Sequence, residues 1–373
     1  MTSRALILGV ALIIGSPADA AQPKQPKCPA HFPSNISPCS EQAFEKLICY
    51  MYTFDPAALD PTSGKPYSTP TCVGGANPEA VSKPYINLLT KAYHLAPSKV
   101  QAALCKLRQI FVTTRTSYGP PRDPIGVWES PDRGGNVWIA IPDYILDNAS
   151  SLDHAENGIL GNLFFPAPSP TTTPYPPYPP YPNGRSLPTF SPSATPAETE
   201  ILAVLAHELG HIMLADTNAE GTKFAGKPGS RPCDKPASAC FDTYFLSGWD
   251  VSKFKQRRWI VPGHANANQY LSSPGFSDIS KDVANGNDSK ATMDTYNGIY
   301  SRPAFVSIFA AVSPEEDYVE TYKYKTLAAA QGASLNLRIS FPNQNHPPSD
   351  VLGNVRARAG ALPNKLDCVP AVN

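Results

Sequence analysis

The chain has 373 residues, of which 42 are proline, and its 31 Lys and Arg residues balance 31 Asp and Glu residues. A hydrophobic content of 42% is sufficient for a packed core, so the composition excludes a wholly disordered chain despite the excess of proline. A neutral chain without basic blocks offers no electrostatic surface to nucleic acids or anionic membranes, and we expect neither as a partner.

The N-terminal residues 1–20 have the pattern of an export signal peptide. Arg4 supplies a positive start, residues 5–14 form an apolar run, and Ala18-Asp19-Ala20 has the small residues of a cleavage site. The run is too short to span a membrane and no later stretch is long enough, so we expect no membrane span. The sequence therefore predicts a secreted or periplasmic protein that is cleaved near Ala20.

Eight cysteines follow the signal peptide, and an even number in an exported chain indicates disulfide bonds. A metal cluster is the alternative interpretation, but the sequence contains no C-x-x-C pair. Cys233 and Cys240 bracket a short loop, and we expect them to pair with each other. The spacing does not assign the other pairings.

The region 21–113 has mainly helical periodicity, with apolar residues three and four positions apart over 42–51, 78–93 and 98–111. We expect a helical N-terminal region over 21–113 held together by disulfide bonds, followed by a second domain over 114–373. That domain begins with two β-rich runs around a Gly-containing turn, which predicts a hairpin whose second strand ends at Pro142. The runs are residues 126–128 and 136–141.

A proline-rich segment over 166–196 contains twelve prolines and places Tyr175, Tyr178 and Tyr181 three residues apart. Since a polyproline II helix has three residues per turn, these three rings would share one face. The segment is interpreted as a stiff surface connection, or alternatively as a strip that contacts substrate or a partner. A long irregular insertion is expected over 216–298.

Two helices have strong start signals. Thr195-Pro196-Ala197-Glu198 has the pattern of a capping box with proline at the first helical position, and apolar residues continue to Leu214. The second helix begins at Ser313-Pro314-Glu315-Glu316 and is expected to end near Gly332.

The first of these helices contains the motif His207-Glu208-Leu209-Gly210-His211. Side chains four residues apart lie on one face of a helix, so both imidazoles can bind one metal ion, for which Zn²⁺ is suited. The alternative is that both histidines are ordinary polar residues on a helix surface. The apolar residues on either side argue against it, because histidines buried without partners are costly.

A catalytic zinc has three protein ligands and one open position, so a third ligand must come from elsewhere in the chain. Glu316 and Glu320 lie four residues apart on the second helix. This spacing allows Glu316 to bind the metal while Glu320 accepts a hydrogen bond from the other nitrogen of a metal-binding histidine. The alternative interpretation is an acidic first turn that complements the helix dipole.

The His-Glu-x-x-His motif with a distant Glu-x-x-x-Glu resembles the gluzincin metallopeptidases. Residues 305–310, which lead into 313–320, are similar to the branch that includes anthrax lethal factor. The resemblance implies an α+β zincin-like fold, in which a small mixed sheet lies over the active-site helix and its edge strand pairs with an extended substrate. Our candidate for that strand is 137–141.

The resemblance also implies a role for each motif residue. His207, His211 and Glu316 would bind one catalytic Zn²⁺, Glu208 would act as the general base, and Glu320 would support a metal-binding histidine. In the lethal-factor branch a tyrosine commonly lies seven residues before the third ligand and stabilises the oxyanion, whereas this chain has Phe309 there.

Losing one oxyanion donor costs a factor of about 100 to 1,000 in turnover. A different group could take over the role of the missing tyrosine hydroxyl. The candidates are Tyr300, Tyr318, Tyr322 and His264.

The sequence thus predicts an exported zinc metalloendopeptidase that hydrolyses peptide bonds of a peptide or protein substrate, with Glu208 activating water. One alternative is a zinc-binding interaction protein of peptidase descent that is weakly active or inactive, as Phe309 would indicate. A second alternative is a self-processing zymogen in which 28–111 is a pro-segment.

Overall fold

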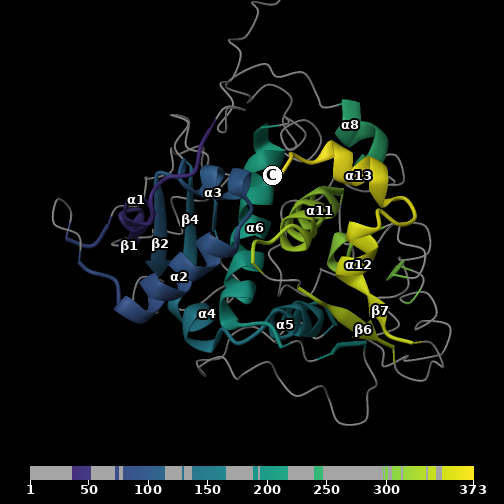
Figure 1. The fold of residues 1–373 in the computed structure, drawn as a ribbon, viewed down its shortest axis with the longest axis horizontal. Coiled ribbons are helices and arrows are strands. Elements are labelled where there is room, and N and C mark those ends of the chain that lie inside the picture. Colours follow the sequence, from purple (N-terminus) through teal and green to yellow (C-terminus); the bar gives the residue numbers. More distant parts are fainter. Residues whose placement is uncertain are drawn as a thin grey trace, which may run out of the picture.

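The computed structural model describes residues 36–51, 72–74, 79–113, 128–129, 137–164, 188–191, 194–216, 239–246, 297, 299–300, 305–311, 314–332, 335–341 and 347–373. It is a mixed α/β structure with two small sheets, which is compatible with the expected α+β class. Helix α6 (Ala197–Asp216) runs through the middle of the molecule, between the larger sheet and the C-terminal helices (Figure 1).

The larger sheet has the strand order β1-β2-β4-β3. Strands β1 (Ile48–Tyr50), β2 (Gln109–Thr113) and β4 (Trp138–Pro142) are parallel, and β3 (Trp128–Glu129) pairs with β4 in antiparallel orientation. The expected antiparallel pairing is therefore confirmed for Trp128, the described residue of the first run, and the second strand ends at Pro142 as expected.

The prediction that 137–141 forms an edge strand is wrong. One side of β4 pairs with β2 and its other side pairs with β3, so β4 lies inside the sheet. The strand at that edge is β3, and it lies against α6.

The N-terminal region is not only helical, because it supplies two of the four strands. The expected helix over 42–51 divides into α1 (Glu41–Glu45) and β1, and the one over 98–111 divides into α3 (Ser98–Leu104) and β2. The expected helix over 78–93 is α2 (Lys83–Leu95). Alternate residues of β2 are buried on opposite faces of the sheet, which suits the β-branched and aromatic side chains of this strand.

Both faces of the larger sheet are covered. Ile110 and Ile139 belong to the main core, together with residues of α2, α3 and α6. Phe111 and Trp138 face the other way, into a smaller buried cluster, with ring centroids 5.7 Å apart. Two helices follow β4 along the chain and lead toward α6: α4 (Asp143–Asn148) and α5 (Leu152–Phe164).

The C-terminal half packs on the opposite side of α6 (Figure 1). Its central helix is α11 (Pro314–Ala328), which begins at the expected proline and lies directly against α6. A small antiparallel sheet joins β5 (Thr189–Phe190), β6 (Arg338–Ser340) and β7 (Ser349–Asp350). The remaining elements are α8 (Ala239–Phe241), η2 (Asp242–Leu246), η5 (Phe309–Ala311), α12 (Val351–Arg356) and α13 (Leu362–Cys368).

Three disulfide bonds join described residues, namely Cys39–Cys105, Cys49–Cys72 and Cys240–Cys368. The predicted bond between Cys233 and Cys240 is therefore wrong. Cys240 lies on α8 beside the end of α13, 5.7 Å from Cys368 between Cα atoms, so a partner 128 residues away replaces the neighbour in sequence. Disulfide-bonded cysteines are compatible with an extracellular location.

Several predictions fall on residues outside the described ranges. They include the signal peptide 1–20, the tyrosines of the proline-rich segment, Cys233 and His264. Among the helices that are described, none is both long enough and apolar enough to cross a membrane.

Candidate metal site

Helix α6 carries the motif, and its start is fixed by contacts with the first residue of α5 and with the chain just before it. Thr195 Oγ1 accepts a hydrogen bond from the Leu152 N–H, and Glu200 accepts one from the Ser150 N–H. The helix begins one residue after Pro196, at Ala197. From its second turn α6 is buried on nearly all sides, as expected of a helix with apolar residues around its whole circumference.

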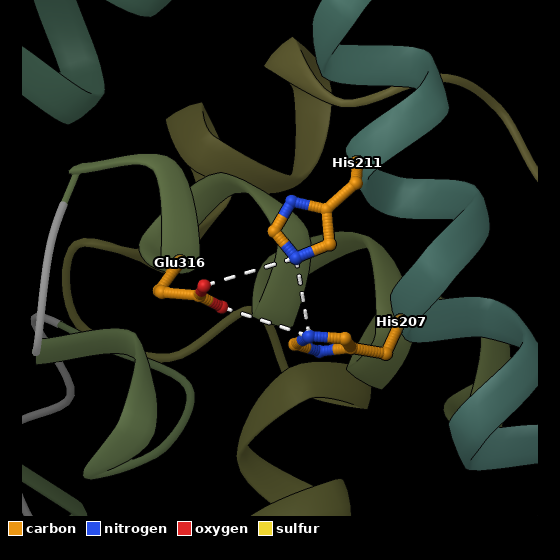
Figure 2. Close-up of side chains that lie close together, drawn as sticks. All are labelled: His207, His211 and Glu316. Carbon is orange, nitrogen blue, oxygen red and sulfur yellow. Dashed lines mark hydrogen bonds and ion pairs between the residues drawn. The ribbon is translucent and has the colours of Figure 1, made fainter. Parts of the chain in front are cut away.

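His207 and His211 project from one face of α6 toward Glu316 on α11 (Figure 2). The two Nε2 atoms lie 3.3 Å apart, and each lies 3.7 Å from an oxygen of Glu316. One ligand atom from each residue can be chosen so that all three lie within 4.8 Å of one another. The structure thus brings together the three residues that the sequence predicted as metal ligands.

This arrangement fits a zinc ion by its donor atoms and by its dimensions. Two nitrogen atoms that bind one tetrahedral zinc at about 2.0–2.1 Å lie about 3.3–3.4 Å apart, which is the spacing of the two Nε2 atoms. The donor set of two imidazoles and one carboxylate is also typical of catalytic zinc sites with an open position.

A close contact between two helices sets the distance from Glu316 to the histidines. Gly210 lies inside the motif, and a Cβ atom at this position would be only 3.1 Å from the Cα atom and the carbonyl oxygen of Val319. The absence of a side chain at Gly210 therefore lets the backbone of α11 approach α6. Glu316 and Glu320 lie on either side of Val319 along α11, so both depend on this contact.

Glu320 supports the ring of His207, as predicted from its spacing. Its Oε1 lies 2.9 Å from His207 Nδ1, and its Oε2 accepts a hydrogen bond from Ser307 Oγ at 2.7 Å. Burial alone would raise the pKa of Glu320, but the charge of Lys323 and the His207 hydrogen bond outweigh it and lower the pKa to about 2. The ionised carboxylate fixes the ring of His207 so that Nε2 faces the metal position.

Glu208 lies beside the triad, with Oε1 4.0 Å from His207 Nε2. Burial is the main reason that its pKa is raised to about 8; the charge of His207 lowers it and that of Glu316 raises it further. Its position beside the triad suits a group that accepts a proton and returns it.

The two histidines of the site differ in charge. Burial lowers the pKa of His207, but the Glu320 hydrogen bond and three nearby carboxylates outweigh burial and raise it to about 9. Burial and the charge of His207 lower the pKa of His211 well below its ordinary value. Burial also raises the pKa of Glu316 to about 7. The proton is therefore held at His207, and His211 is neutral.

Phe309 lies directly against the site, with its ring stacked on that of His207 at a centroid distance of 5.7 Å. The side chain at the expected oxyanion position is thus close to the candidate metal ligands but has no hydrogen-bond donor.

Three of the candidates for a replacement oxyanion donor lie among the described residues, and each is buried in the core. The Tyr300 hydroxyl accepts a hydrogen bond from the Ile308 N–H, the Tyr318 ring packs against Phe245 at 5.3 Å, and the Tyr322 side chain is buried. These contacts favour structural roles for all three tyrosines.

The sequence analysis missed three polar residues that hold Glu320 in place, two by direct contact and one through another residue. Ser307 and Lys323 contact it directly, and Glu156 on α5 lies 2.9 Å from Lys323 Nζ. The i, i+3 spacing from Glu320 to Lys323 is a signal that could have identified the lysine. By contrast, Asp317 forms an ion pair with Lys365 of α13.

Comparison with known proteins does not assign the chain to a family. No protein-family model, curated protein or solved structure matches the chain.

Proposed function

We propose that the protein is an exported zinc-dependent peptidase that hydrolyses peptide bonds. The observation that supports the proposal is the convergence of His207 Nε2, His211 Nε2 and a Glu316 oxygen, at spacings that suit one zinc ion. The same residues carry the sequence resemblance to the gluzincin metallopeptidases. A zincin-like arrangement of sheet and active-site helix is part of this proposal.

Each residue around the triad has a role in the proposed reaction. Zinc, when bound, polarises water and the substrate carbonyl. Glu208 lies beside the triad, where it accepts the proton of the attacking water and delivers it to the leaving amine. Glu320 keeps Nδ1 of His207 as the donor, so that Nε2 is free to bind metal.

The edge strand β3 is the proposed place of substrate binding. It lies against α6, and an extended peptide could add to an edge strand through main-chain hydrogen bonds. Strand β4, which the sequence suggested, pairs with β2 along its whole length and with β3 at Ile139 and Ala140.

The test is digestion of a peptide library by the purified protein and by its Glu208→Gln variant. We expect the parent protein to cleave and phenanthroline to stop the cleavage. The variant is expected to retain one zinc ion per chain but to lose cleavage by a factor of at least about 100, because it cannot accept the proton. Cleavage that persists at the parent rate in the variant contradicts the role of Glu208.

Phe309 favours a second candidate function, a zinc-binding interaction protein that is weakly active or inactive. Phe309 takes the sequence position where the resemblance has a tyrosine, its ring lies against His207, and it cannot donate a hydrogen bond. The same digestion separates the two functions, because this candidate predicts zinc binding without cleavage by the parent protein.

A further inference from the structure

Behind Glu320, charged side chains continue into the core in an unbroken series of contacts. Lys323 Nζ lies 2.8 Å from Glu320 Oε1 and 2.9 Å from Glu156 Oε1. The second oxygen of Glu156 accepts a hydrogen bond from the Tyr324 hydroxyl at 2.8 Å. This buried ion chain (Glu320, Lys323, Glu156 and Tyr324) connects α5 and α11 to His207 on α6.

The whole ion chain is removed from water. Exposed fractions are 0% for Glu320, 1% for Lys323 and 2% for Glu156. Burying three charges is costly, and apolar side chains of similar volume often stabilise a core equally well. Core stability alone therefore does not account for charges at these positions, whereas a need to fix one side chain in one orientation does.

The contacts of Glu320 leave its carboxylate little freedom to rotate. Oε1 is shared by His207 Nδ1 and Lys323 Nζ, and Oε2 is held by Ser307 Oγ. The hydrogen bond to His207 can keep its direction only while both oxygens stay in place. A tilt of the carboxylate would turn the imidazole and move its Nε2 away from Glu316 and His211.

Lys323 needs an anchor of its own to act in this way. A lysine side chain has four rotatable bonds and loses much conformational freedom when its ammonium group is held. Glu156 provides this anchor from a different helix, and the Tyr324 hydroxyl holds Glu156 in turn.

We propose that Lys323, anchored by Glu156, is a positioning residue for the metal site, because it holds Glu320 and thereby the ring of His207 in the orientation that binds zinc. This inference rests on the proposed function, but it concerns metal binding and not peptide cleavage.

The experiment compares zinc dissociation constants and cobalt spectra of full-length variants. The double variant with Lys323→Met and Glu156→Gln removes the cation together with its second partner, so that Glu156 is not left as an unpaired charge. We expect its zinc dissociation constant, measured by competition with a chelator, to rise about tenfold or more. The visible spectrum of the cobalt(II)-loaded protein is expected to change as well, because it reports the geometry of the ligands.

Glu156→Gln alone is the milder variant, since an amide can still accept a hydrogen bond from Lys323. We expect a smaller rise of the zinc dissociation constant and a cobalt spectrum shifted in the same direction. If the double variant does not fold, the single variant decides the question.

Lys325→Met is the matched control on the same helix. Lys325 Nζ donates to the carbonyl oxygens of Leu366 and Val369, so its loss is expected to lower thermal stability but to leave zinc affinity and the cobalt spectrum unchanged. Parent-like zinc affinity and cobalt spectra in the Glu156 variant and in any folded double variant overturn the inference. If the parent protein itself binds no zinc, that result contradicts the proposed function, and this inference with it.

Discussion

His207 and Glu316, two of the three candidate metal ligands, both have raised pKa values. The His207 pKa of about 9 results from the Glu320 hydrogen bond and the carboxylates around it, which together outweigh burial. His211, only 3.3 Å away, is neutral because burial and the charge of His207 lower its pKa. Glu316, with a pKa of about 7, is partly protonated near neutral pH.

Zinc binding near neutral pH is expected to release about two protons, one from His207 and fractions from Glu316 and from Glu208 beside the site. Groups whose pKa lies above the solution pH hold protons that compete with zinc, so affinity should rise with pH up to about pH 9. Calorimetric titration of the zinc-free protein in two buffers with different ionisation enthalpies measures the protons released. An affinity that is constant from pH 6 to 9 contradicts this charge distribution.

The candidate ligands could be predicted because each depends only on local spacing. His207 and His211 share a helix face at i, i+4, and so do Glu316 and Glu320, so two short segments contain the whole set. Glu156 could not be predicted, because it reaches Lys323 from 167 residues away through the packing of α5 against the core.

At the scale of elements, the contact between α6 and α11 determines whether the ligands meet. Val319 packs onto the bare backbone of Gly210, one residue before Glu320 and three after Glu316. Helical propensity alone disfavours glycine here by about 1 kcal/mol relative to alanine, so the close approach is the physical reason for its presence.

Gly210→Ala is therefore expected to lower the free energy of unfolding by about 1–3 kcal/mol and to weaken zinc binding, because a Cβ pushes α11 outward. Thermal unfolding and zinc titration of the variant measure both effects. If helical propensity dominated, the variant would be more stable and would bind zinc as the parent does, and that result would contradict a tight helix contact.

The helices of the site were predictable and the strands were only partly so. Helix α11 has strong start signals, and α6 is long and densely apolar. Strands β1 and β2 follow short helices within runs of apolar residues. A short apolar run fits both the helical period of 3.6 residues and the two-residue period of a strand. Their parallel pairing joins segments about 60 residues apart, which no local pattern encodes.

At the scale of the whole molecule, the N-terminal region shares a sheet with β4, the strand that precedes α4, α5 and α6 along the chain. Strand β2 pairs with β4 along five residues, from Gln109↔Trp138 to Thr113↔Pro142. Removing this region would expose the edge of β4 and the apolar side chains behind it. The pairing therefore favours a mature protein that keeps the region over a self-processing zymogen that releases it.

The disulfide bonds close loops of very different length, 128 residues for Cys240–Cys368 and 23 for Cys49–Cys72. Loop-closure entropy predicts that removing the longer link, by alanine at both positions, destabilises the protein by about 1–2 kcal/mol more than removing the shorter one. Chemical denaturation of the two double variants gives this difference. An equal or smaller loss for the Cys240–Cys368 variant contradicts the expectation.

The central claim is that His207, His211 and Glu316 together bind one zinc ion. A crystal structure of the zinc-loaded protein, with anomalous data on both sides of the zinc absorption edge, tests it most directly. We predict one strong zinc peak at about 2.0–2.2 Å from both Nε2 atoms and one Glu316 oxygen. A zinc-loaded crystal with no peak between these three side chains, or with its zinc bound by other residues, would contradict the account.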